Sequence, residues 1–177
     1  MANFFDRVFT IITDILIKIL PISKRDKKSY SYYRAGLLAQ DEGRYSEALE
    51  NYYEALQFDE SPEDRSYILY NIGTIYGQSG QLSKALDYYH HALQLNPKSH
   101  QALHNIGLIF HAQGMMALGM KNKKVNPDFD NIEYRELAVL FFDKASEYWR
   151  QTIKIAPTNY PKIQNWLKVT GRLTDDE

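Results

Sequence analysis

The sequence contains no cysteine and has almost no excess of charge. Without cysteine the chain has no disulfide, no thiol nucleophile and no Cys-ligated zinc. Its 21 Lys and Arg against 22 Asp and Glu give a net charge of −1, which argues against nucleic-acid binding because that function requires a basic excess. A glycine-rich phosphate loop and a nucleophile motif are also missing. The sequence therefore predicts a protein that is not an enzyme and has neither a cofactor nor a small-molecule substrate.

What the chain does have is a repeated unit of small and aromatic residues. Gly107 follows Gly73 by 34 residues, and Gly36 precedes it by 37. The three additional residues fall near Ser61, which is expected to cap the next helix, with acids in its first turn. This spacing resembles the tetratricopeptide pattern, in which each repeat forms two antiparallel helices. The other residues of the pattern in the unit around Gly73 are Ile72, Tyr76, Gly80, Ala85, Tyr89, Ala92 and Pro97.

The expected fold is all-α, a right-handed superhelical array of three tetratricopeptide hairpins with one further helix at each end. The third repeat departs from the pattern, because 50 residues separate Gly107 from Pro157 where 24 separate Gly73 from Pro97. We expect its first helix to continue past Gly114 and its hairpin to project beyond the array. The expected divisions are an N-terminal amphipathic helix and basic linker at 1–28 and a repeat domain at 29–177, with repeats at about 29–61, 62–97 and 98–157, an insertion near 115–141 and a capping helix at 160–173.

Residues 3–20 are expected to form a helix with one apolar and one polar half, which Pro21 ends. Four charged side chains on the polar half make a transmembrane span costly. Two interpretations stay open. The helix caps the repeat array, or its apolar half lies in a membrane interface or docks an apolar partner. In a membrane interface the basic residues at 24–28 would face anionic headgroups. The residues expected to associate with the membrane are Phe4, Phe5, Val8, Phe9, Ile12, Ile15, Leu16 and Ile19.

Three histidines of the third repeat lie on one face of its first helix. His100, His104 and His111 are spaced i, i+4 and i+11. Two histidines four residues apart can bind a metal, but no carboxylate shares this face. We therefore expect no metal site and place these histidines along a concave surface of the array.

The concave surface is expected to form a groove that binds a partner peptide in an extended or helical form. Its lining is aromatic and polar with few charges. The groove therefore lacks the Lys and Arg with which chaperone-tail-binding repeats hold two carboxylates. The predicted groove residues are Tyr30, Tyr33, Leu37, Tyr67, Tyr70, Thr74, Gln101, His104, Leu108 and His111.

Several longer stretches resemble one family of tetratricopeptide-repeat proteins. They include YYRAG at 32–36, DRSYILYNIG at 64–73 and NWLK at 165–168. Over nearly its whole length the chain resembles the photosystem I assembly proteins of chloroplasts and cyanobacteria. The resemblance implies a non-enzymatic assembly factor, peripheral to the thylakoid membrane on its stromal or cytoplasmic face. Its implied partners are photosystem I subunits, with other assembly factors as further candidates.

A second hypothesis is a general co-chaperone or import adaptor that binds peptide segments. The missing basic groove residues count against it. A pull-down from solubilised thylakoids separates the two hypotheses, because only an assembly scaffold should retrieve photosystem I subunits.

Overall fold

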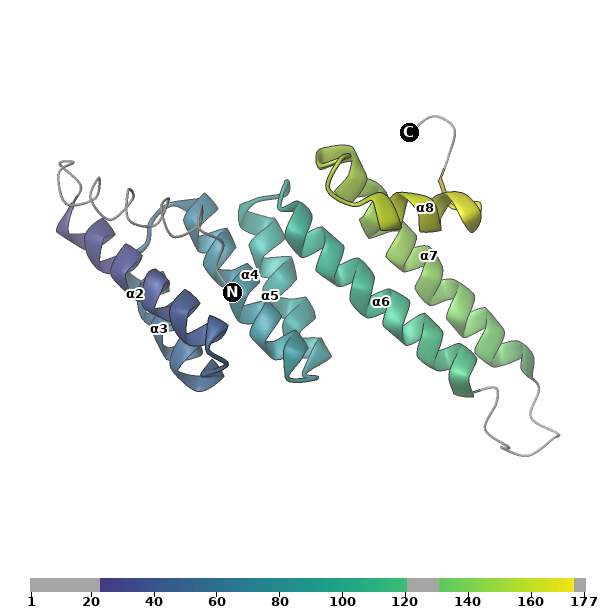
Figure 1. Cartoon of the computed structure of the whole chain (residues 1–177), viewed down its shortest axis with the longest axis horizontal. Coiled ribbons are helices and arrows are strands. Elements are labelled where there is room, and N and C mark those ends of the chain that lie inside the picture. Colours follow the sequence, from purple (N-terminus) through teal and green to yellow (C-terminus); the bar gives the residue numbers. More distant parts are fainter. Residues whose placement is uncertain (1–22, 121–130, 174–177) are drawn as a thin grey trace. The chain divides into compact units, whose positions relative to one another are not determined.

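The computed structural model describes residues 23–120 and 131–173, and every regular element within them is an α-helix. The all-helical fold expected from the sequence is confirmed for this part of the chain. The helix expected at 3–20 lies outside the described residues, as does most of the loop expected in the third repeat. In chain order the helices are α2 (Lys24–Asp41), α3 (Tyr45–Phe58), α4 (Pro62–Gln78), α5 (Leu82–Leu95), α6 (His100–Met120), α7 (Asn131–Ile155) and α8 (Pro161–Val169) (Figure 1).

The chain forms two compact units, which we call unit 1, ending at Ile68, and unit 2, beginning at Leu69. The boundary falls inside α4, so the first half of this helix belongs to unit 1 and the second half to unit 2. Such a boundary is consistent with a repeat protein, in which each hairpin contacts mainly its nearest neighbours.

The turns inside the first two hairpins share one backbone geometry. Gly43 has a φ of 76° and Gly80 a φ of 74°, in the left-handed region that glycine adopts without a Cβ clash. The residue after each glycine donates its backbone N–H to the carbonyl five positions earlier, at 2.8 and 2.9 Å. These hydrogen bonds satisfy the last carbonyls of α2 and α4 and direct the chain back along the hairpin.

In each of the three hairpins a glycine of the first helix lies against an aromatic ring of the second. A Cβ built on any of these glycines would lie closer than 3.0 Å to a ring atom, a contact that real side chains do not make. The rings themselves are almost completely buried. The repeat therefore requires glycine at this position for steric reasons. The pairs are Gly36 with Tyr52, Gly73 with Tyr89 and Gly107 with Trp149.

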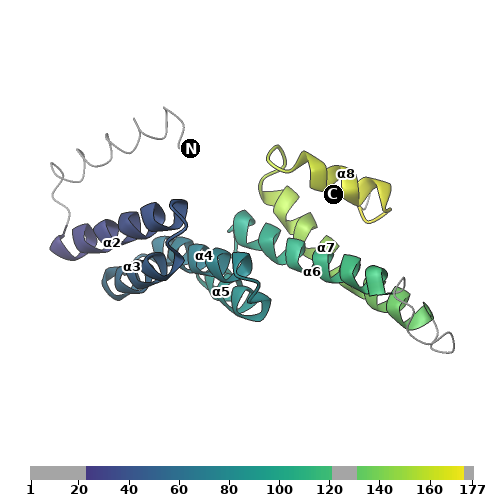
Figure 2. The same ribbon diagram turned by 60° about the horizontal axis from the view of Figure 1, so that its bottom comes forward.

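Unit 1 is built on the hairpin of α2 and α3, which lie side by side in antiparallel directions (Figure 2). Its centre contains Ala39, Ala48, Tyr52 and Ala55, all with no exposed surface. The small side chains allow the helices to approach, and the tyrosine ring fills the space that they leave. The Tyr52 hydroxyl donates to the side-chain oxygen of Gln40 at 2.7 Å, so its polar end is satisfied although the ring is buried.

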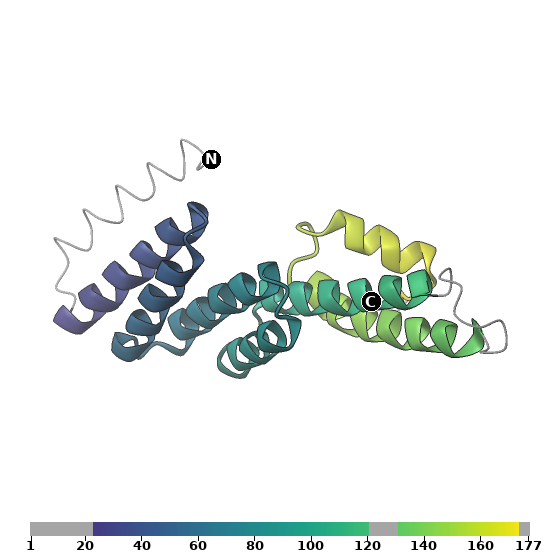
Figure 3. The same ribbon diagram turned by 90° about the horizontal axis from the view of Figure 1, so that it is seen from below.

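Unit 2 contains the second half of α4 and the helices from α5 to α8. One buried cluster joins Ala85, Tyr89 and Ala92 of α5 to α6, and a second joins α7 to α8 around Trp149 and Leu167. The third hairpin is the longest, with 21 residues in α6 and 25 in α7 against 14 in α5 (Figure 3). The expected continuation of its first helix past residue 114 is confirmed as far as residue 120.

Candidate partner-binding surfaces

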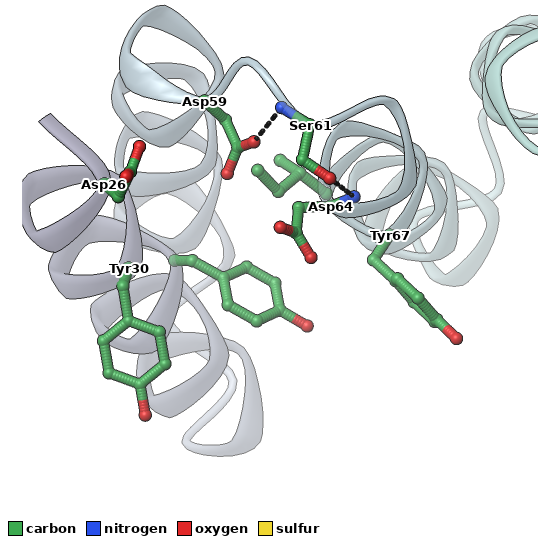
Figure 4. A pocket seen from close by; sticks show the side chains of 8 residues that line it. Asp26, Tyr30, Asp59, Ser61, Asp64 and Tyr67 are labelled. Atoms are coloured by element: carbon green, nitrogen blue, oxygen red, sulfur yellow. Dashed lines mark hydrogen bonds between the residues drawn. The ribbon is translucent and has the colours of Figure 1, made fainter. Parts of the chain in front are cut away.

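Unit 1 contains a pocket of about 630 Å³ that is lined by tyrosine rings and carboxylates. We call it the tyrosine–aspartate pocket. Of the four groove residues predicted in this unit, Tyr30, Tyr33 and Tyr67 line it. Leu37 does not line it and is 39% exposed on α2. The remaining lining residues are Asp26, Asp59, Ser61, Asp64 and Ile68 (Figure 4).

The turn between α3 and α4 holds two of the carboxylates in place. The Asp59 carboxylate accepts a hydrogen bond from the Ser61 backbone N–H at 3.0 Å and another from the Ser29 hydroxyl at 2.7 Å. The Ser61 hydroxyl accepts from the Asp64 backbone N–H at 3.2 Å, which confirms Ser61 as the N-cap of α4. The start of α4 is therefore fixed by its own capping bonds, and Asp64 takes its position from them.

The surroundings of Asp64 make the charged form of its side chain less favourable. Burial, with a smaller contribution from the Asp59 carboxylate, raises the pKa of Asp64 above its ordinary value. Two arginines of the same elements are engaged with other groups. Arg65 donates to the backbone carbonyls of Leu56 and Asp59, and Arg25 forms an ion pair with Glu60 at 2.7 Å.

The three aspartates of the pocket were not among the residues predicted from the sequence. Asp64 was interpreted only as a first-turn acid that favours the helix dipole, which is the commoner role of an acid at that position. Asp26 occupies the corresponding first turn of α2. The repeat pattern predicts which helix faces line the groove, but it says nothing about side chains at helix starts and turns. The capping motif at the start of α4 was the one feature of the sequence that indicated the position of this pocket.

The groove residues predicted on α4 within unit 2 are part of its internal packing. The Tyr70 ring lies 5.9 Å from the ring of Tyr89, between centroids, and is partly buried against the α5–α6 cluster. The Thr74 hydroxyl donates to the Tyr70 carbonyl at 3.0 Å and accepts from the Tyr89 hydroxyl at 3.4 Å. A binding role for these two side chains stays a prediction.

Two of the groove residues predicted on α6 contact aromatic rings of later elements. The His104 ring lies 4.7 Å from the ring of Tyr160, just before α8. The His111 ring lies 5.3 Å from Trp149 and 5.3 Å from Trp166, both between centroids. Tyr160 and α8 therefore cover part of this face. Gln101 is partly buried and Leu108 is exposed, and neither brings a charge to the surface.

Burial lowers the pKa values of His104 and His111, and the neighbouring His100 adds to the effect at His104. The His104 Nδ1 atom is buried and has no hydrogen-bond partner among the described residues. Within residues 23–120 and 131–173, no group of three or more His, Asp or Glu is arranged to hold a metal ion. His104 and His111 pack against aromatic rings within unit 2.

The third hairpin exposes several large apolar side chains. On α6 these are Leu108, Met115 and Met116, and the last of them is 61% exposed. On α7 Leu137 and Leu140 are exposed as well. A contiguous exposed apolar patch marks a surface that contacts another protein, and these side chains are the candidates for such a patch on this hairpin.

Comparison with known proteins agrees with this architecture. Family models of the tetratricopeptide repeat match residues 29–62 and 66–99. The fold and these matches define the chain as a tetratricopeptide-repeat protein. It belongs to the family of the photosystem I assembly protein Ycf3. The protein of that name from Trieres chinensis is 65% identical over all of this chain and 99% of its own length. Those from Porphyra purpurea and Chlorella vulgaris are 57% and 55% identical over 97% and 96% of this chain and 92% and 95% of their own lengths.

Among solved structures, a monomeric mutant of IFIT1 is similar, with a TM-score of 0.59 and 23% identity. The match covers 81% of this chain and 30% of that one, and at this identity it concerns the fold alone. None of the helices within the described residues has the length and apolar character needed to cross a membrane.

Proposed function

We propose that this protein is a non-catalytic assembly factor for photosystem I, which holds subunits of that complex on its tetratricopeptide surfaces. The observation that carries the proposal is 65% identity along the whole chain to a relative named photosystem I assembly protein. The match covers the whole chain, so it includes all the helices and turns of the repeats. The tetratricopeptide class supports a binding role, because its stacked helices offer extended surfaces to other proteins.

Two surfaces are suited to protein partners. In unit 1 the tyrosine–aspartate pocket offers aromatic side chains, which are enriched at the energetic centres of protein interfaces. In unit 2 the apolar side chains of α6 and α7 offer a surface for an apolar segment of a partner. The two surfaces differ in chemistry, so the protein can bind two kinds of segment.

The proposed location is the stromal or cytoplasmic face of the thylakoid membrane, with peripheral attachment through residues 3–20. The separation of apolar and polar side chains in that segment supports this attachment. Deletion of residues 1–22 removes none of the described helices. The shortened chain should remain folded and no longer sediment with vesicles that contain anionic lipid. If it unfolds and the full chain never sediments with vesicles, the segment is a cap of the repeat array.

The proposed partners are tested by retrieval from solubilised thylakoids with a tagged full-length chain. Photosystem I subunits should be enriched over other thylakoid complexes. A matched pair of variants locates the contact: Tyr67→Ala changes the pocket, and Tyr45→Ala removes a similarly exposed tyrosine at the start of α3 that does not line it. Retrieval of chaperones in place of photosystem I subunits would favour the co-chaperone hypothesis.

A further inference from the structure

We infer that the tyrosine–aspartate pocket of unit 1 binds an arginine side chain presented by a peptide segment of a protein partner. This inference rests on the proposed function, since it names the chemistry of the segment that the protein would bind. Neither the tetratricopeptide pattern nor the clamp that other repeats use for acidic peptides predicts such a pocket. The pocket carries carboxylates where that clamp carries Lys and Arg, so the two are opposite in charge.

The size and walls of the pocket fit a long, flat cationic group. Its volume of about 630 Å³ lies within the range of roughly 300–1,000 Å³ that is usual for ligand pockets. Tyr30, Tyr33 and Tyr67 contribute rings to the lining. A guanidinium is planar and weakly hydrated, so it packs on aromatic faces better than an ammonium does. Within this chain the Arg34 guanidinium already lies 5.9 Å from the centroid of the Tyr30 ring.

The carboxylates supply the charge complementarity that favours a cation over a neutral peptide. Figure 4 shows the Asp64 carboxylate directed into the space between Tyr30 and Tyr67. Asp59 is held by the hydroxyl of Ser29 and the backbone of the α3–α4 turn, so its carboxylate is positioned before any partner arrives. A positioned carboxylate can accept two parallel N–H bonds from one guanidinium.

The proximity of these acids gives a further reason for a cationic occupant. Burial, and to a smaller degree the neighbouring Asp59 carboxylate, make it harder for Asp64 to hold its charge. Two arginines of the same elements are engaged with other groups, Arg25 with Glu60 and Arg65 with backbone carbonyls. A guanidinium from a partner would relieve the repulsion and be held by the same groups.

The test uses the full chain and two short peptides that differ at one side chain. The probe is an acetylated and amidated pentapeptide with arginine between pairs of alanines, and its control carries citrulline, which has nearly the same shape without the charge. Binding is followed by NMR shifts of backbone amides. The arginine peptide should shift amides of residues 61–68 and the citrulline peptide should not. Equal shifts with both peptides, or no shifts with either, would overturn the inference.

A matched pair of variants locates the charge. Asp26→Asn with Asp64→Asn removes two charges from the pocket lining, and Glu50→Gln with Glu136→Gln removes two exposed charges outside it. The aspartate pair should weaken binding of the arginine peptide at least tenfold, and the glutamate pair by less than about twofold, as expected for distant surface charges. Circular dichroism and thermal unfolding confirm that both variants are folded. Unchanged affinity in a folded aspartate variant would show that the peptide binds elsewhere.

The inference and the proposed function can fail separately. If the aspartate variant loses the arginine peptide but still retrieves photosystem I subunits, the pocket exists and those subunits bind through another surface. If the wild-type chain binds the arginine peptide but retrieves no photosystem I subunit, the proposed function is wrong and the pocket serves a different partner. If the peptide does not bind while the subunits are retrieved, only the inference is wrong.

Discussion

Replacing Gly73 by leucine should loosen unit 2 by separating α4 from α5. A Cβ at this position would lie 2.8 Å from two ring atoms of Tyr89 and 3.2 Å from the Cβ of Tyr88. Tyr89 is 3% exposed and cannot rotate away, because its hydroxyl contacts Thr74 and accepts from the Asn105 side chain at 3.1 Å. The leucine must therefore displace the ring or the helix.

The expected cost combines two opposing effects. Overpacking of a close helix contact costs about 1–3 kcal/mol and more when several carbons are inserted. Leucine is a better helix former than glycine by about 0.8 kcal/mol, which offsets part of it. We expect a net destabilisation of about 2 kcal/mol, which corresponds to a fall in midpoint temperature of about 4–8 °C for a chain of this size.

The control for this variant is the same substitution at Gly119 in α6. A Cβ there would meet no atom within 4 Å, so Gly119→Leu should be neutral or slightly stabilising. Thermal unfolding of both variants is followed by far-UV circular dichroism. If Gly73→Leu unfolds at the wild-type temperature, the close approach of glycine and ring does not limit the packing of the repeat.

Four further substitutions, at three positions, separate backbone, packing and binding effects. Gly80→Ala should destabilise the protein by about 1–2 kcal/mol, because Gly80 has a φ of 74° although an added Cβ would meet no atom within 4 Å. Gly80→Asn should cost less, because asparagine adopts the left-handed region more readily than alanine. Thermal unfolding of the two variants checks this order. Tyr67→Ala should change stability by less than about 0.5 kcal/mol and reduce partner retrieval, because Tyr67 is 42% exposed. Tyr89→Ala should cost about 3–5 kcal/mol, since it empties a buried site; unfolding midpoints and retrieval yields, measured together, test this contrast.

The repeat framework could be predicted because it depends on residues whose spacing is fixed by helix geometry. Gly36, Gly73 and Gly107 each mark a close helix contact, and Gly43 and Gly80 each mark a turn with positive φ. These requirements involve the backbone itself, so the sequence shows them directly. The extension of α6 was also predictable, because 50 residues separate Gly107 from Pro157 and an insertion of that size can lengthen the helices of the hairpin.

The side-chain environment of the predicted groove residues depended on contacts that the repeat pattern does not contain. His111 occupies a groove position of α6, but Trp166 arrives from a helix some fifty residues later and packs against it. Tyr70 was predicted as a groove residue, and its ring also packs on Tyr89. The aspartates of the pocket lie at helix starts and turns, where local capping explains each one separately and only the folded chain brings them together.

The buried histidines of unit 2 should make its stability depend on pH. Burial lowers the pKa values of His104 and His111, so the folded state binds protons less readily than the unfolded state. For a base with a lowered pKa, the stability is complete above the unfolded pKa of about 6.5 and falls as the pH drops below it. Acid should therefore lower the unfolding temperature between about pH 6.5 and 5, before most carboxylates are protonated.

A substitution at His104 tests this assignment, because its Nδ1 is buried without a hydrogen-bond partner among the described residues. His104→Phe keeps a ring beside Tyr160, where the centroids are 4.7 Å apart, and removes both the titration and the unsatisfied nitrogen. It should unfold at or above the wild-type temperature at pH 7 and lose less stability below about pH 6.5. The control is His90→Phe on α5, because His90 is exposed. A wild-type pH dependence that persists in His104→Phe would assign the effect to other groups, His111 first among them.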